Sequence, residues 1–144
     1  MDIETTDEVL EKAVVAGLDG LDFITSYSTA EIAEAFNGIG PEFLTEGERE
    51  RLSKYLDLFM PAALIHDMRF TYNDGSRYGF YFANCEFRKN CLALANQKYS
   101  PFNWRRYRAH AAAEFLFAAV CSQAGWVAYC EAFRKRQNQT KESK

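Results

Sequence analysis

A histidine and an aspartate stand next to each other near the middle of the chain, as His66 and Asp67. On a helix their side chains point about 100° apart, so the two cannot act as one hydrogen-bonded pair. A neutral imidazole can take a proton from water, and a carboxylate supplies the oxygen ligands that calcium prefers. These two residues therefore suit two tasks on adjoining helix faces, a general base and a cation ligand.

A glycine-rich loop with the sequence NGIGP occupies residues 37–41, upstream of the histidine. Glycine tolerates positive φ, so such a loop can turn several backbone carbonyls towards one point. We expect the carbonyls of Gly38 and Gly40 to join Asp67 as calcium ligands, with Asp74 as a more remote candidate. The competing interpretation of the loop is a helix stop followed by a turn.

A histidine that acts as a base needs an acceptor to orient its second nitrogen. The turn signal at 73–76 predicts an antiparallel helix after it, whose first turns lie opposite His66. In the first turns of that helix, Asn84 and Glu86 are the available polar residues. Glu86 lies about 200° further round the helix than Asn84, so the two cannot both face the histidine.

The order of these features resembles the phospholipase A2 superfamily, especially the branch without dense disulfides. That branch includes the phospholipase domains of parvoviral capsids and related bacterial and phage proteins. The resemblance spans roughly residues 37–94. It rests on the loop NGIGP, the stretch AALIHD, an aromatic four residues after the histidine (Phe70), and AN..F (Ala83, Asn84, Phe87) where the family usually has AD..F.

The resemblance implies calcium-assisted hydrolysis of the sn-2 ester of a glycerophospholipid. His66 would activate the attacking water, Asp67 and the loop carbonyls would hold calcium, and Asn84 would orient the imidazole. The family usually has aspartate and tyrosine where this chain has Asn84 and Phe70. Loss of the comparable carboxylate costs a serine protease about four orders of magnitude in rate, so the resemblance implies lost or altered activity.

The competing class is a non-enzymatic helical binding or structural protein, of the kind that a phage or mobile element encodes. The same residues would then serve packing, as His110 is expected to do in the last helix. The basic and aromatic cluster at 104–108 suits a lipid headgroup, a nucleic acid or merely a solvated helix face. A net charge of −3 makes nucleic acid the weakest of the three. A phospholipid or membrane surface is the expected partner, and a protein partner is the alternative.

Hydrophobic residues make up 48% of the chain and aromatic residues 15%, which is enough for a core. We expect one all-α domain of antiparallel helices over 1–136, with a phospholipase A2-like core at about 37–97 and a polar tail at 137–144. Pro61 either starts a new helix or kinks a long one, and 78–82 could be a short extended piece. Periodicity and capping predict helices over 6–16, 28–36, 45–55, 56–70, 78–97 and 104–136.

The N-terminal residues show no basic segment followed by an apolar core, so no classical secretory signal is expected, and synthesis is expected in the cytoplasm. The longest apolar run, 109–120, contains His110 and Glu114 and is too short to cross a bilayer. The four cysteines do not have the spacing of a zinc site. Free thiols are expected, and one long-range bridge between two helices stays open as the alternative.

Overall fold

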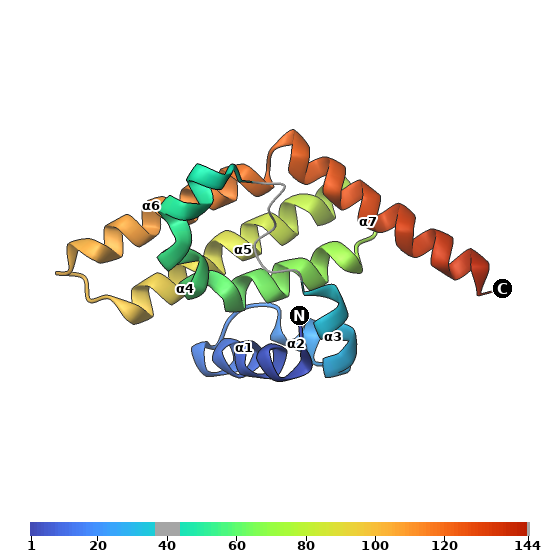
Figure 1. The fold of residues 1–144 in the computed structure, drawn as a ribbon, viewed down its shortest axis with the longest axis horizontal. Coiled ribbons are helices and arrows are strands. Elements are labelled where there is room, and N and C mark those ends of the chain that lie inside the picture. The colour runs from blue at the N-terminus through green and yellow to red at the C-terminus, as the bar shows by residue number, and fades with distance from the viewer. Residues whose placement is uncertain (37–43, 144) are drawn as a thin grey trace.

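The computed structural model describes residues 1–36 and 44–143, and every regular element within them is a helix (Figure 1). The all-α prediction is therefore confirmed. The helices are α1 (Ile3–Ala16), α2 (Leu21–Ile24), α3 (Thr29–Ala35), α4 (Glu46–Thr71), α5 (Arg77–Lys98), α6 (Trp104–Val120) and α7 (Gln123–Glu142).

Helix α4 is one long element with Pro61 inside it, which is one of the two alternatives that the sequence left open, and no boundary falls between 55 and 56. Thr45 starts it with a capping box, in which its hydroxyl accepts the Glu48 N–H and the Glu48 carboxylate accepts the Thr45 N–H. Pro61 lies inside the helix, and its missing N–H leaves the Asp57 carbonyl without its helical partner. Figure 1 shows the first turns of α4 running at a steep angle to the rest, as a proline kink predicts.

The second half of α4 forms the centre of the core. Helices α1, α3, α5 and α7 all contact α4, so its side chains are buried on more than one face. The four residues Ala62–Ile65 are at most 2% exposed, and His66 continues the same buried stretch. The apolar run before the histidine is thus a buried segment of a helix that packs against several others.

A five-residue connection, 72–76, turns the chain from α4 into α5. Asn73 fixes it, because its amide donates to the carbonyls of Phe70 (2.6 Å) and Tyr129 (3.0 Å) and its Oδ1 accepts the Gly75 N–H. Gly75 has φ 77°, a left-handed conformation that favours glycine. Helix α5 begins directly afterwards at Arg77, which excludes the extended alternative for 78–82 and sets α4 and α5 antiparallel.

The predicted continuous helix over 104–136 is wrong, because it is divided into α6 and α7 with a bend of 59° between them. Helix α6 ends at Val120, and Ser122 starts α7 by accepting the Gly125 N–H. A Cβ atom at Gly125 would clash with the Val120 carbonyl, so only glycine allows the two helices to meet this closely. Helix α7 then continues to Glu142, through most of the predicted tail.

Replacing Gly125 by alanine is expected to destabilise the protein by about 1–3 kcal/mol, the usual cost of inserting a methyl group into a filled space. The bend must open to relieve the clash with the Val120 backbone, which cannot rotate away as a side chain could. Urea unfolding followed by circular dichroism measures the change. Gly47→Ala is the control, because a Cβ there meets nothing within 4 Å. Equal stability of the two variants would contradict the steric argument.

No single described helix is both long and apolar enough to cross a membrane. Helices α6 and α7 reach the necessary length and composition only when they are counted together across their bend.

Candidate functional site

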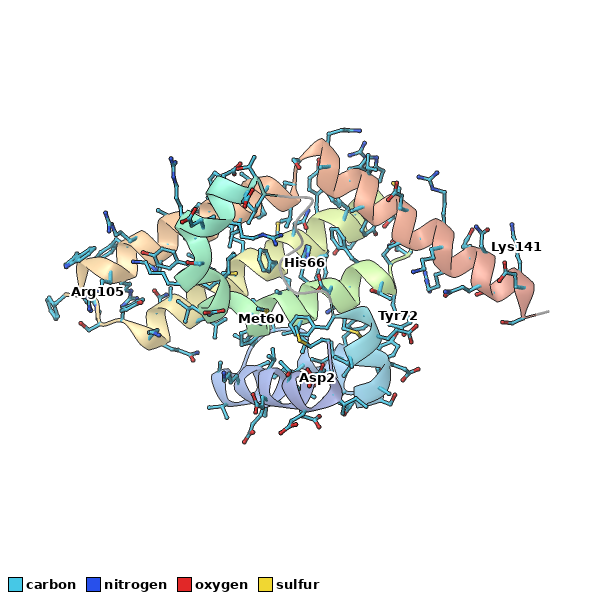
Figure 2. All side chains as sticks on the ribbon, viewed as in Figure 1. Asp2, Met60, His66, Tyr72, Arg105 and Lys141 are labelled. Atoms are coloured by element: carbon cyan, nitrogen blue, oxygen red, sulfur yellow. The ribbon has the colours of Figure 1, made fainter. Side chains whose placement is uncertain are left out.

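His66 and Asn84 are hydrogen-bonded to each other in the core between α4 and α5. The His66 Nε2 atom lies 2.8 Å from Asn84 Oδ1. His66 is 5% exposed and Asn84 is completely buried, and Figure 2 shows the histidine at the centre of the molecule. The rings of Phe70 and Phe87 lie 4.2 and 4.9 Å from the imidazole centroid. The structure thus brings together the two residues for which the sequence predicts a catalytic role.

The second hydrogen bond of Asn84 determines the tautomer of the histidine. Its Nδ2 donates to the Val120 carbonyl at 3.2 Å, so its Oδ1 must be the atom that faces His66. An amide oxygen can only accept, and His66 Nε2 therefore carries the proton. The other ring nitrogen, Nδ1, is left with a lone pair, which is the state that a general base requires.

Burial keeps the imidazole neutral. Removal from water lowers the pKa of His66 from 6.5 to about 4, and the hydrogen bond that His66 donates to Asn84 opposes that shift only in part. Asparagine carries no charge that would stabilise the imidazolium form. The site therefore contains an uncharged base of low proton affinity at neutral pH.

Acidification is expected to destabilise the protein through His66. The unfolded chain has the ordinary pKa of 6.5 and binds a proton more readily than the folded protein, whose His66 has a pKa of about 4. The contribution to stability is complete above pH 6.5 and is lost as the pH falls to 4, by about 3 kcal/mol in total. Urea unfolding across this range, compared with His66→Gln, measures it. An equally steep fall in the variant would contradict the assignment to His66.

Only one of the three predicted calcium ligands, Asp67, lies in the described residues. Asp67 is half-buried on the α4 face adjoining His66. Gly38 and Gly40 lie outside the described residues. In the described residues no group of three His, Cys, Asp or Glu side chains is placed to hold a metal. The role of Asp67 as a side-chain ligand stays a prediction, in which backbone carbonyls would supply the other ligands.

The remaining polar candidates have structural partners of their own. Glu86 pairs with Arg69, with Oε1 3.0 Å from its Nε, so it does not orient the histidine. Asp74 accepts from Ser76 within the turn and from the Tyr129 hydroxyl, and these hydrogen bonds lower its pKa. Both carboxylates therefore serve the structure around α4 and α5.

His110 forms a second histidine–asparagine pair, which the sequence analysis missed. Its Nε2 lies 2.6 Å from Asn96 Oδ1, at the surface between α5 and α6. Their separation of 14 residues across a helical hairpin was the feature of the sequence that could have indicated this pair. Because this pair is at the surface, it provides a natural control for the buried one.

All four cysteines are free thiols, so the predicted reduced state is the one the structure shows. Burial raises the pKa of Cys91 and of Cys121, which keeps both thiols protonated and weakly nucleophilic. Cys91 and Cys121 therefore add no nucleophile to the site.

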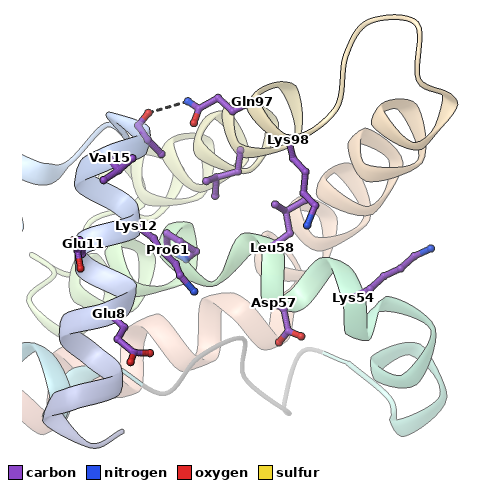
Figure 3. A pocket seen from close by; sticks show the side chains of 12 residues that line it. Glu8, Glu11, Lys12, Val15, Lys54, Asp57, Leu58, Pro61, Gln97 and Lys98 are labelled. Atoms are coloured by element: carbon purple, nitrogen blue, oxygen red, sulfur yellow. Dashed lines mark hydrogen bonds between the residues drawn. The ribbon is translucent and has the colours of Figure 1, made fainter.

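A groove with a volume of about 890 Å³ lies between α1, α4 and α5 (Figure 3). Charged side chains of both signs surround an apolar floor that includes Leu58 and Leu94. Neither a histidine nor a cysteine lines it, and its ionisable side chains are carboxylates and lysines. The sequence analysis gave no indication of this groove.

Comparisons of the chain with protein-family models, with curated proteins and with solved structures found no match. The functional argument therefore rests on the geometry around His66.

Proposed function

We propose that this protein is a phospholipase A2-like ester hydrolase of low activity, acting on the sn-2 ester of glycerophospholipids. The observation that supports it is the 2.8 Å contact between His66 Nε2 and Asn84 Oδ1. That contact fixes the imidazole in the tautomer whose Nδ1 can accept a proton from water. A hydrogen bond between these two helices is also what the resemblance to the family implies.

In this proposal each residue has one task. His66 Nδ1 takes the proton of the attacking water, and Asn84 holds the ring in position through Nε2. Asp67 and the backbone of Gly38 and Gly40 would hold calcium, which when bound polarises the ester carbonyl and stabilises negative charge on it. Because Asn84 is neutral, the imidazolium formed on proton transfer is poorly stabilised, which explains why we propose a slow reaction.

The test is release of fatty acid from mixed phosphatidylcholine and phosphatidylglycerol vesicles. We expect slow release that requires calcium, stops when a chelator is added, and falls to the vesicle background in His66→Ala. His110→Ala is the matched control, because it removes the surface member of the other histidine–asparagine pair. Absence of release by the folded wild-type protein, or equal release by His66→Ala, would reject the proposal.

A second candidate function is non-enzymatic binding, with the buried pair serving only the fold. The observation in its favour is that Asn84 uses both ends of its amide within the core, towards His66 and towards the Val120 carbonyl. Buried hydrogen-bond networks commonly serve to specify a unique core. This candidate gains if the protein releases no fatty acid and calcium does not change its melting temperature.

A further inference from the structure

The connection between α5 and α6 projects aromatic side chains into solvent. Phe102 is 99% exposed, Trp104 59% and Tyr107 56%. Figure 1 shows this connection at one end of the long axis of the molecule, and Figure 2 places Arg105 there. We call residues 98–108 the hairpin tip. It lies outside the segment 37–94 that resembles phospholipase A2.

Positive charge is concentrated around the same tip. Residues 87–113 contain six Lys and Arg residues and no Asp or Glu, whereas the rest of the chain has 11 basic and 20 acidic residues. The net charge is therefore +6 for residues 87–113 and −9 for the rest of the chain, which together give the net charge of −3. Four of the six cations belong to the tip, namely Lys98, Arg105, Arg106 and Arg108. The other two, Arg88 and Lys89, are paired with Glu114 and Asp19.

The tip is ordered by contacts that leave its charges available. The Tyr107 hydroxyl donates to the Pro101 carbonyl at 2.8 Å, which closes the connection. The guanidinium groups of Arg105 and Arg108 lie 5.6 and 5.0 Å from the Trp104 ring centroid. Among the described residues no ion pair joins these arginines to a carboxylate.

The position of the arginines in α6 is unfavourable for the helix itself. A helix N-terminus has partial positive charge and favours acidic residues. Helix α6 has no acidic residue in its first turn and has Arg105 and Arg106 there instead. Such an arrangement is compensated when an anion binds against this end.

We propose that the hairpin tip docks on an anionic phospholipid surface, with Phe102 and Trp104 entering the headgroup region and the arginines binding phosphates. Aromatic side chains prefer that interface, and basic side chains beside it are attracted by acidic lipids. The tip is convex, so it suits a bilayer surface better than a protein groove. A strand of nucleic acid would contact more of the chain than the tip. The residues outside 87–113 carry a net charge of −9 and would repel it, so charge complementarity favours the membrane.

The experiment uses the full chain with His66→Ala and a chelator present, so that binding is measured without hydrolysis. Its outcome is therefore separate from that of the proposed function. Vesicles of phosphatidylcholine alone and of phosphatidylcholine with phosphatidylglycerol are sedimented with the protein. The chain has two tryptophans, so a Trp126→Phe variant retains Trp104 alone. The fluorescence emission of Trp104 should shift to the blue on binding.

We expect binding to the anionic vesicles only. Arg105→Gln/Arg108→Gln should weaken it on the order of 30-fold, from two lost charges near the surface. The matched control is Arg134→Gln/Lys135→Gln, which removes two exposed charges from α7 and should leave binding unchanged. Trp104→Ser should weaken sedimentation without any change of charge, which tests the aromatic contribution separately.

Three outcomes would overturn the proposal. One is equal binding to neutral and anionic vesicles, or to neither. Another is an equal loss in the α7 control, which would show that net charge alone decides. The third is retention on a short DNA duplex at salt concentrations where vesicle binding has already been lost, which would assign the tip to nucleic acid instead.

Discussion

Asn84→Asp is expected to raise the rate of fatty-acid release by about 10²–10⁴-fold, the reverse of what a serine protease loses when its orienting aspartate becomes asparagine. The carboxylate would accept the same Nε2–H that Asn84 Oδ1 accepts now at 2.8 Å. It would also stabilise the imidazolium that forms when Nδ1 takes a proton. The pKa of His66, now lowered to about 4 by burial, should rise as a result.

The measurement has two independent readouts, the rate of release from mixed vesicles and the titration of the His66 ring protons by NMR. The control is Asn90→Asp, a buried asparagine on the same helix that contacts the backbone of Asp19 and no histidine. A folded Asn84→Asp protein with a raised His66 pKa but no increase in release would contradict the role of His66 as a base. It would favour the non-enzymatic candidate.

Asn84→Leu is expected to destabilise the protein by about 2–6 kcal/mol, because two buried polar groups lose their partner at roughly 1–3 kcal/mol each. One is the His66 Nε2–H, and the other is the Val120 carbonyl. Val120 is the last residue of α6, so Asn84 also caps that helix at its bend into α7. Urea unfolding with circular dichroism gives the change in free energy.

A double variant separates the two losses. His66→Phe/Asn84→Leu removes the unsatisfied donor as well as its acceptor, so it should be less destabilised than Asn84→Leu alone. The remaining cost then belongs to the Val120 carbonyl. A cost below about 0.5 kcal/mol for Asn84→Leu, the usual range for surface positions, would show that the amide is not part of a tight network.

The local sequence pattern was sufficient to predict that α4 and α5 are antiparallel neighbours. The turn residues at 73–76 leave the chain only a short connection, and a short connection between two helices makes them antiparallel. His66 lies a few residues before the end of α4, and Asn84 lies at a similar height after the start of α5. The two side chains were therefore expected to meet. The exact helix ends were harder to predict. Pro61 lies inside α4, and the helix predicted over 104–136 is interrupted after Val120.

The sequence by itself determined that the chain is helical and that an imidazole faces the first turns of the next helix across a hairpin, because periodicity and turn residues act over a few positions. The resemblance to the family then selected the amide of Asn84 as its partner. Only the tertiary structure decided how deeply that pair is buried, how far the His66 pKa falls, and that the Val120 carbonyl holds Asn84. The reason is that desolvation depends on all the helices packed around a group. The carbonyl that orients the amide lies 36 residues further along the chain, beyond the reach of any local pattern.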